Sequence, residues 1–200
     1  VVRAFKGIRP IPELASKIAA LPYDVMNSEE AREMVKGDKY SFLHVDKAEV
    51  DLDPSIDVHD KRVYEKAREN LDKKIQDGEY IQDEKPCLYI YRQIMNGRPQ
   101  TGLVFCASID DYINNVIKKH EFTREDKEQD RINHVDYCNA NTGPIFLTYR
   151  ENKEISSIIN AWVQKKPEYD FVSEDGISHI VWVIDDADTV NRITTLFKGV

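Results

Sequence analysis

Apolar residues recur along the chain at the spacing that is typical of amphipathic helices. Between residues 63 and 75 every fourth position is apolar and most positions between are charged, and Gly78 follows as a helix stop signal. Asn27, with Glu30 three residues later, resembles a capping box that opens another helix. Similar spacing predicts further helices at residues 12–21, 111–117, 155–162 and 187–197, and one that begins near Thr123.

Runs of β-branched and aromatic residues, separated by turn residues, predict strands. Residues 87–95 and 100–109 are two such runs, and Asn96-Gly97 between them is a strong hairpin signal. Asp175-Gly176 marks a second turn of this kind. Further apolar runs predict strands at residues 2–5, 41–45, 144–149, 169–173 and 177–184. We therefore expect an α+β or α/β fold with a mixed β-sheet, flanking helices and one β-hairpin near residues 87–109.

No break in composition divides the chain. Its 200 residues contain no Pro/Gly/Ser-rich linker, no internal repeat and no low-complexity tract, so we expect a single α/β domain over residues 1–200. Hydrophobic residues make up 41% of the chain, which is enough to bury a core. Because the last predicted helix runs almost to residue 200, we also expect the chain to be part of a longer protein.

Charge and hydropathy argue against several classes of protein. A net charge of −8 at pH 7 leaves no broad basic surface for nucleic acid. No apolar run approaches the roughly 18–20 residues of a membrane helix, and no signal-peptide core opens the chain, so we predict a cytoplasmic protein without membrane contact. The three cysteines, Cys87, Cys106 and Cys138, are odd in number and far apart, which argues against a disulfide framework and against a zinc site.

Acids, bases and a histidine occur close together just after residue 117. His120 and Glu121 precede a predicted helix, whose free backbone N–H groups favour anions. Glu121 has the chemistry to take a proton from a substrate hydroxyl, and Lys119 and Arg131 have the chemistry to hold phosphate oxygens. Asp130 would orient Arg131. The alternative is a solvated helix face joined by ion pairs, the usual meaning of such a charge run.

Three further polar residues join these candidates as ligand-binding residues. Arg3 opens a short series of basic residues near the N-terminus, Asp24 follows a proline and a tyrosine in a loop, and Asn141 lies in a polar loop before a predicted strand. Each also has a plainer explanation, as a surface charge, a turn residue and a helix C-cap respectively.

Several sequence blocks resemble the family known as domain of unknown function 1015. The chain reads Val-Arg-Ala-Phe-Lys-Gly at 2–7, Leu-Pro-Tyr-Asp-Val-Met at 21–26, Lys-His-Glu-Phe-Thr at 119–123, Asp-Arg at 130–131 and Asn-Thr-Gly-Pro at 141–144. The order and spacing of these blocks fit the family from near residue 1 to about residue 150. Full-length members carry a later Asp-Gly-His-His-Arg motif, which this chain lacks, so the resemblance also implies an N-terminal half.

That later motif is similar to one in free-serine kinases of the ParB/sulfiredoxin superfamily, in which an upstream His-Glu pair supplies the catalytic carboxylate. By this distant resemblance His120 and Glu121 would be the catalytic pair, and the cofactor would be ATP or ADP with magnesium. The resemblance implies a phosphotransferase-like or nucleotide-binding protein that acts on a small hydroxylated metabolite. The alternatives are a non-catalytic module that binds a ligand, a nucleic acid or a protein, and a scaffold that forms a homodimer.

Overall fold

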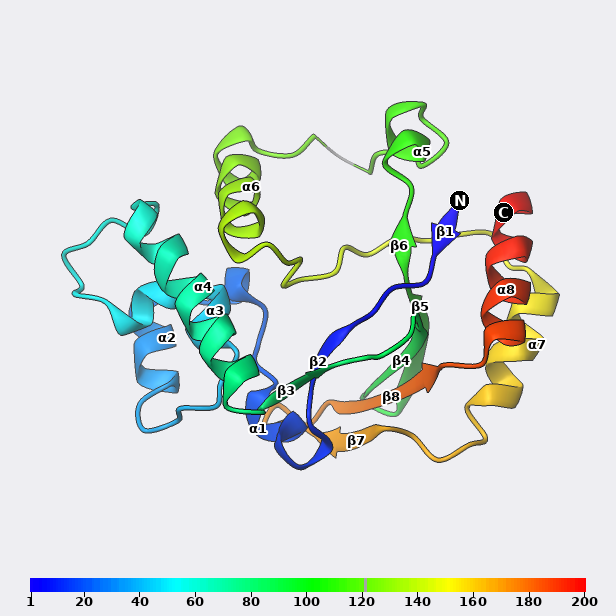
Figure 1. The fold of residues 1–200 in the computed structure, drawn as a ribbon, viewed down its shortest axis with the longest axis horizontal. Helices are drawn as coiled ribbons and strands as arrows, with labels where there is room; N and C mark the ends of the chain where they lie inside the picture. The colour runs from blue at the N-terminus through cyan, green and yellow to red at the C-terminus, as the bar shows by residue number, and fades with distance from the viewer. Residues whose placement is uncertain (121) are drawn as a thin grey trace. The chain divides into compact units, whose positions relative to one another are not determined.

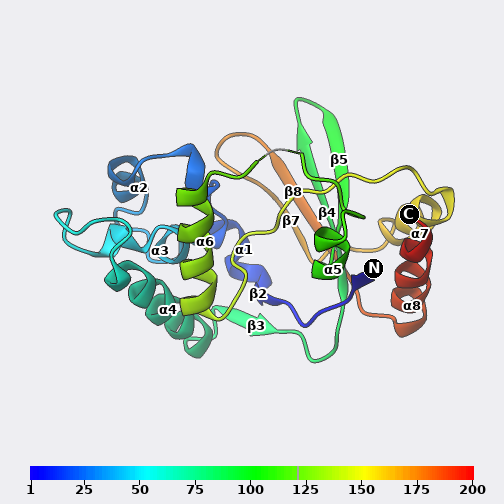
Figure 2. The ribbon, with the colours of Figure 1, turned by 90° about the horizontal axis from the view of Figure 1, so that it is seen from above.

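The computed structural model describes residues 1–120 and 122–200, and these residues form two compact units (Figures 1 and 2). Unit 1 consists of Val1–Pro12, Gln82–His120 and Ile145–Val200, and unit 2 consists of Glu13–Ile81 and residues 122–144. Each unit therefore combines segments that are distant in the sequence. The single domain expected from the sequence stays a prediction.

Unit 1 contains a four-stranded antiparallel sheet. Its strands, in spatial order, are β5 (Arg98–Val104), β4 (Leu88–Met95), β8 (Ser178–Ile184) and β7 (Tyr169–Val172). Asn96 and Gly97 join β4 to β5 with φ of 52° and 76°, the left-handed pair that a tight hairpin turn requires. Gly176, with φ of 81°, turns β7 into β8. Both predicted turns are confirmed.

Two helices pack on one face of this sheet, α7 (Lys153–Trp162) and α8 (Ala187–Leu196), and they lie side by side in both views (Figures 1 and 2). Cross-strand pairing places Leu88 beside Ile184 and Ile90 beside Trp182. These four side chains are buried together with apolar residues of both helices. Full burial of each such side chain contributes about 1.5–3 kcal/mol. The apolar spacing along residues 155–162 and 187–197 therefore predicts these helices correctly.

The remaining elements of unit 1 are short. They are β1 (Val2–Arg3), β2 (Ile8–Pro10), β6 (Cys106–Ala107), α5 (Ile109–Ile113) and the 3-10 turn η4 (Phe197–Gly199). β1 pairs antiparallel with β6, which confirms a strand at the start of the chain. The hydroxyl of Ser108 caps α5 by accepting from the N–H of Asp111 at 3.3 Å.

Unit 2 is mainly helical. Its elements, with β3 at the junction with unit 1, are η1 (Pro12–Leu14), α1 (Ala15–Ile18), η2 (Tyr23–Val25), α2 (Ser28–Met34), α3 (Leu43–Asp46), η3 (Ala48–Asp51), α4 (Lys61–Gln76), β3 (Tyr80–Gln82) and α6 (Glu125–Cys138). α4 and α6 lie side by side in both views (Figures 1 and 2). Their shared core contains Val45, Ala67, Leu71 and Cys138.

The sequence predicts the ends of two helices in unit 2 well. The Asn27 side chain accepts from the N–H of Glu30, whose carboxylate accepts from the N–H of Asn27, so the capping box of α2 is confirmed. α4 ends just before Gly78, which has φ of 74° and supplies the left-handed stop that was predicted.

Two predictions of local structure are wrong. Residues 41–45 include the start of α3 and form no strand, because a short apolar run has no periodicity that separates a strand from a buried helix. Residues 144–149 form no strand, and no neighbouring strand pairs with them among the described residues. The helix predicted to begin near Thr123 is α6, which begins at Glu125 with Arg124 as its N-cap.

The fold class is confirmed as α+β, and the four-stranded sheet is antiparallel where a mixed sheet was expected. Cys87 and Cys138 are buried and Cys106 is exposed, and all three are free thiols. Within the described residues, no helix combines the length and the apolar character that crossing a membrane requires.

Candidate functional site

Asp130, halfway along α6, is the centre of a hydrogen-bonded cluster in unit 2. Its carboxylate accepts from the Tyr64 hydroxyl of α4 at 2.8 Å and from Nη2 of Arg131 at 2.8 Å, and His59 Nδ1 lies 3.3 Å away. Burial by itself would raise the pKa of Asp130, but the hydrogen bonds from Tyr64 and Arg131 outweigh it and lower the pKa. Asp130 is therefore a fixed, ionised carboxylate.

Arg131 is held between this carboxylate and an aromatic ring. Its Nε and Nη2 both donate to Oδ2 of Asp130, at 3.1 and 2.8 Å. Its guanidinium carbon lies 4.1 Å from the centroid of the Tyr23 ring, within the range of a cation–π contact. Its Nη1 has no partner among the described residues, and 30% of the side chain is exposed. The Nη1 group of this rigidly held guanidinium thus stays available to an anion.

The exposed side of Arg131 faces an open hollow of about 570 Å³ in unit 2. The lining residues come from η2, α6 and the segment before α6, and they are Tyr23, Thr123, Lys127, Glu128, Arg131, Ile132, Val135 and Asp136. Lys127 and Arg131 are one helical turn apart, so both cations reach the same face of α6. The volume is in the range of small-molecule sites. The hollow therefore combines apolar walls with two cationic groups, Lys127 and Arg131, and two carboxylates, Glu128 and Asp136.

A buried carboxyl group, Asp46 at the end of α3, belongs to the same part of unit 2. Its Oδ1 is buried and has no hydrogen-bond partner among the described residues. Burial raises the pKa of Asp46, and a hydrogen bond from Thr142 and the positive charges of His134 and Arg131 oppose this effect. His134 is itself buried and donates from Nε2 to the carbonyl oxygen of Val45 at 2.9 Å.

The sequence singles out neither Asp46 nor the two tyrosines of this cluster. Asp46 directly follows the apolar run 41–45, and a carboxylate next to such a run is a signal for a buried acid. Tyr64 lies within the regular helical pattern of α4, where nothing distinguishes its hydroxyl group from those of other tyrosines. Tyr23 precedes a predicted site residue, and its role depends on packing between distant segments.

Among the predicted site residues of unit 2, the structure brings Asp130 and Arg131 into direct contact. Asp24 is exposed in η2 and does not line the hollow. Asn141 is exposed in the segment that follows α6. Asn139, with φ of 49°, is the residue that ends α6 in a left-handed conformation.

Three other predicted site residues belong to unit 1, and a fourth lies outside the described residues. Arg3 is exposed on β1. Lys119 is exposed and its Nζ lies 4.7 Å from the centroid of the Tyr112 ring. His120 is exposed. Glu121, the predicted base, is the residue that the structure does not describe, so its catalytic role and that of His120 stay predictions.

No metal centre is formed by the described residues, since no three His, Cys, Asp or Glu side chains are grouped as metal ligands would be. The family model described as Protein of unknown function (DUF1015) matches residues 2–200. No curated protein and no solved structure matches the chain.

Proposed function

The chain belongs to the family Protein of unknown function (DUF1015), and from that premise we propose that unit 2 binds a phosphate-bearing small molecule through Arg131. We infer further that this binding serves a phosphotransferase-like reaction on a small hydroxylated metabolite. The description of the family assigns no activity. The proposal therefore depends on the geometry around Arg131.

The observation that carries the proposal is the fixed orientation of Arg131. Asp130 holds one side of the guanidinium at 2.8 Å, and the Tyr23 ring stacks on its face at 4.1 Å. The side chain therefore loses little conformational entropy when an anion binds, and a planar fork of N–H donors matches the oxygen atoms of a phosphate. Asp130 does not compete strongly for the remaining donor of Arg131, its Nη1 group, because Tyr64 and His59 also contact the Asp130 carboxylate.

The walls of the hollow support a ligand with an apolar portion beside its phosphate. Ile132 and Val135 line the hollow beside Arg131 and are 52% and 37% exposed. Lys127 supplies a second cation for the phosphate. A nucleotide such as ATP or ADP has both features, and magnesium would then be held mainly by the phosphate oxygens.

Titration calorimetry on the full chain tests the binding step. We expect ADP with magnesium to bind, and Arg131→Ala to weaken binding by roughly tenfold or more, as expected for a lost charge-assisted contact. Arg124→Ala is the matched control, because Arg124 precedes the same helix, pairs with Asp126 at 2.7 Å and does not line the hollow. Equal affinities for wild type and Arg131→Ala would overturn the proposal.

The chemical step is assigned to Glu121 as general base, on the resemblance to free-serine kinases. Turnover of ATP with a panel of amino acids and sugars tests it in the full-length protein. We expect Glu121→Gln to abolish turnover while ADP binding persists. Unchanged turnover in this variant would remove the assigned role of Glu121 and leave a non-catalytic binding module. A homodimer and a cytoplasmic location stay predictions from the sequence.

A further inference from the structure

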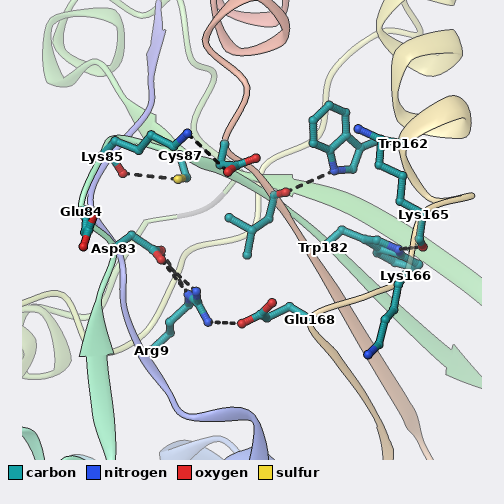
Figure 3. A pocket seen from close by; sticks show the side chains of 12 residues that line it. Arg9, Asp83, Glu84, Lys85, Cys87, Trp162, Lys165, Lys166, Glu168 and Trp182 are labelled. Atoms are coloured by element: carbon teal, nitrogen blue, oxygen red, sulfur yellow. Dashed lines mark hydrogen bonds and ion pairs between the residues drawn. The ribbon is translucent and has the colours of Figure 1, made fainter.

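Unit 1 contains a separate hollow of about 570 Å³ at the end of its sheet (Figure 3). Its lining comes from β2, the segments before β4 and β7, the C-terminal end of α7, and β8 with the residue after it. The residues are Arg9, Asp83, Glu84, Lys85, Cys87, Trp162, Lys165, Lys166, Glu168, Trp182, Val183 and Asp185. Both tryptophans of the chain are among them.

The walls of this hollow are held by the two indole N–H groups. Trp162 Nε1 donates to the carbonyl oxygen of Val183 at 3.2 Å, and Trp182 Nε1 donates to the carbonyl oxygen of Lys165 at 2.9 Å (Figure 3). These bonds connect the end of α7 and the segment after it to the edge of β8. A hollow with such fixed walls is preorganised for a ligand.

An unpaired stretch of strand edge borders the same hollow. β7 pairs with β8 only as far as Val181, so β7 leaves the edge of β8 uncovered at Val183. The Val183 carbonyl points to this edge, because it accepts from Trp162. In an antiparallel strand the N–H of a residue points to the same edge as its carbonyl. The Val183 N–H therefore faces the uncovered edge, and it has no partner there among the described residues.

The charges that line the hollow are not evenly paired. Arg9 donates to Asp83 and Glu168, and Lys85 lies 3.4 Å from Asp185. By contrast, the structure pairs neither Lys165 nor Lys166 with a carboxylate in the part of the chain that it describes. Two cations therefore remain for a ligand, together with one carboxylate, Glu84, that the described residues do not pair.

The two unpaired lysines extend to different sides of the hollow. Lys165 reaches along Trp162, with its Nζ 3.2 Å from the ring centroid, whereas Lys166 extends away from Trp162 (Figure 3). The two ammonium groups are therefore separate cationic positions at this hollow and not a single paired site. The indole of Trp162 would provide an apolar contact.

We propose that this hollow binds a small organic oxyanion, a carboxylate or a phosphate ester attached to a flat apolar group. The Val183 N–H and one of the two lysines bind the anionic oxygen atoms, and Trp162 contacts the apolar group. The site is distinct from the one proposed at Arg131, since every residue that lines it belongs to unit 1.

Intrinsic tryptophan fluorescence tests this proposal directly, because Trp162 and Trp182 both line the hollow. The probes are benzoate, phenyl phosphate and the neutral benzamide, each added to the full chain. We expect a saturable change with at least one of the two anions and none with benzamide, and the anion that binds tells a carboxylate site from a phosphate site. Equal responses to benzamide and to the anions, or no saturable response to either anion, would overturn the proposal.

Matched variants test the role of the lysines. We expect the double variant Lys165→Ala/Lys166→Ala to weaken the binding of the anion at least tenfold and Lys153→Ala, at the other end of α7, to leave it unchanged. Arg131→Ala also leaves it unchanged, which separates this site from the proposed phosphate site. Both lysines are exposed, so the double variant folds, and circular dichroism checks this. Undiminished binding in the double variant would contradict the proposal.

Discussion

The Tyr64 hydroxyl on α4 donates a 2.8 Å hydrogen bond to the Asp130 carboxylate on α6. This bond joins two helices that are far apart in the sequence and contact each other along the core of unit 2. It also fixes the carboxylate that orients Arg131. The stability of unit 2 and the geometry of the proposed phosphate site therefore share one contact.

Removal of this hydroxyl is expected to affect both properties. Tyr64→Phe should lower the free energy of unfolding by about 1–2 kcal/mol, because a buried hydrogen bond to a charged group is lost. Burial and the nearby Asp130 raise the pKa of Tyr64 to about 12, so the lost group is a neutral donor at pH 7. Urea denaturation measures the change. Tyr112→Phe is the control, since the Tyr112 side chain is 46% exposed.

Asp46 provides a test of a buried charge. Burial raises the pKa of Asp46 in the folded state above the ordinary value of 3.8. As the pH rises from 3.8 to the raised pKa, the unfolded chain loses the proton more readily than the folded chain, so the free energy of unfolding falls. Asp46→Asn should therefore raise the free energy of unfolding at pH 7, by on the order of 1 kcal/mol. Thermal unfolding at pH 4 and pH 7 measures this. A less stable variant at pH 7 would show that the charges of His134 and Arg131 outweigh the effect of burial.

His44 is expected to make stability depend on pH near neutrality. The hydrogen bond of its Nδ1 to Asp51, at 2.9 Å, is the largest cause of a pKa raised above 6.5, and partial burial opposes it. The stabilisation that protonated His44 gains from Asp51 is complete below pH 6.5, and it is lost as the pH rises through the raised pKa of His44 in the folded state. Urea denaturation between pH 5.5 and pH 8.5 measures it.

Two variants locate this effect at the ion pair. Both His44→Gln and Asp51→Asn should flatten the dependence of stability on pH relative to wild type. His179, whose pKa is lowered by burial, contributes with the opposite sign and is unchanged in both variants. An undiminished dependence on pH in both variants would exclude the pair as its source.

Gly7 is a position where any side chain meets a neighbour. Its N–H donates to the Tyr89 hydroxyl at 2.9 Å, and an added Cβ would overlap that hydroxyl and the ring. Gly7→Ala should lower the free energy of unfolding by about 1–3 kcal/mol through overpacking. Gly102→Ala in β5 is the matched control, since a Cβ added there would have no neighbouring atom within 4 Å. Thermal denaturation of both variants measures the difference, and equal stability would contradict the close contact.

Local signals account for the parts of the fold that were predicted correctly. Asn96-Gly97 and Gly176 determine turns through backbone conformations that few other residues adopt. Asn27 and Glu30 determine a helix start by bonding to each other's backbone N–H groups. In each case the residues involved lie within a few positions of one another, so the pattern is readable along the chain.

The wrong predictions concern segments whose conformation depends on distant partners. Residues 41–45 and 144–149 have the composition of strands, but a strand exists only where another strand pairs with it. The first segment lies instead in the helical core of unit 2, where Val45 is buried beside Ala67. The second has no pairing strand among the described residues.

For the candidate sites, the sequence by itself determined which chemical groups are present, including the adjacent acid and base at Asp130 and Arg131. Only the tertiary structure decided what surrounds them: the Tyr23 ring from η2, the Tyr64 hydroxyl from α4 and the buried Asp46 from α3. The physical reason is that helix ends and turns follow from bonds between near neighbours in the chain. The burial and orientation of a charge depend instead on segments that meet only when the chain folds.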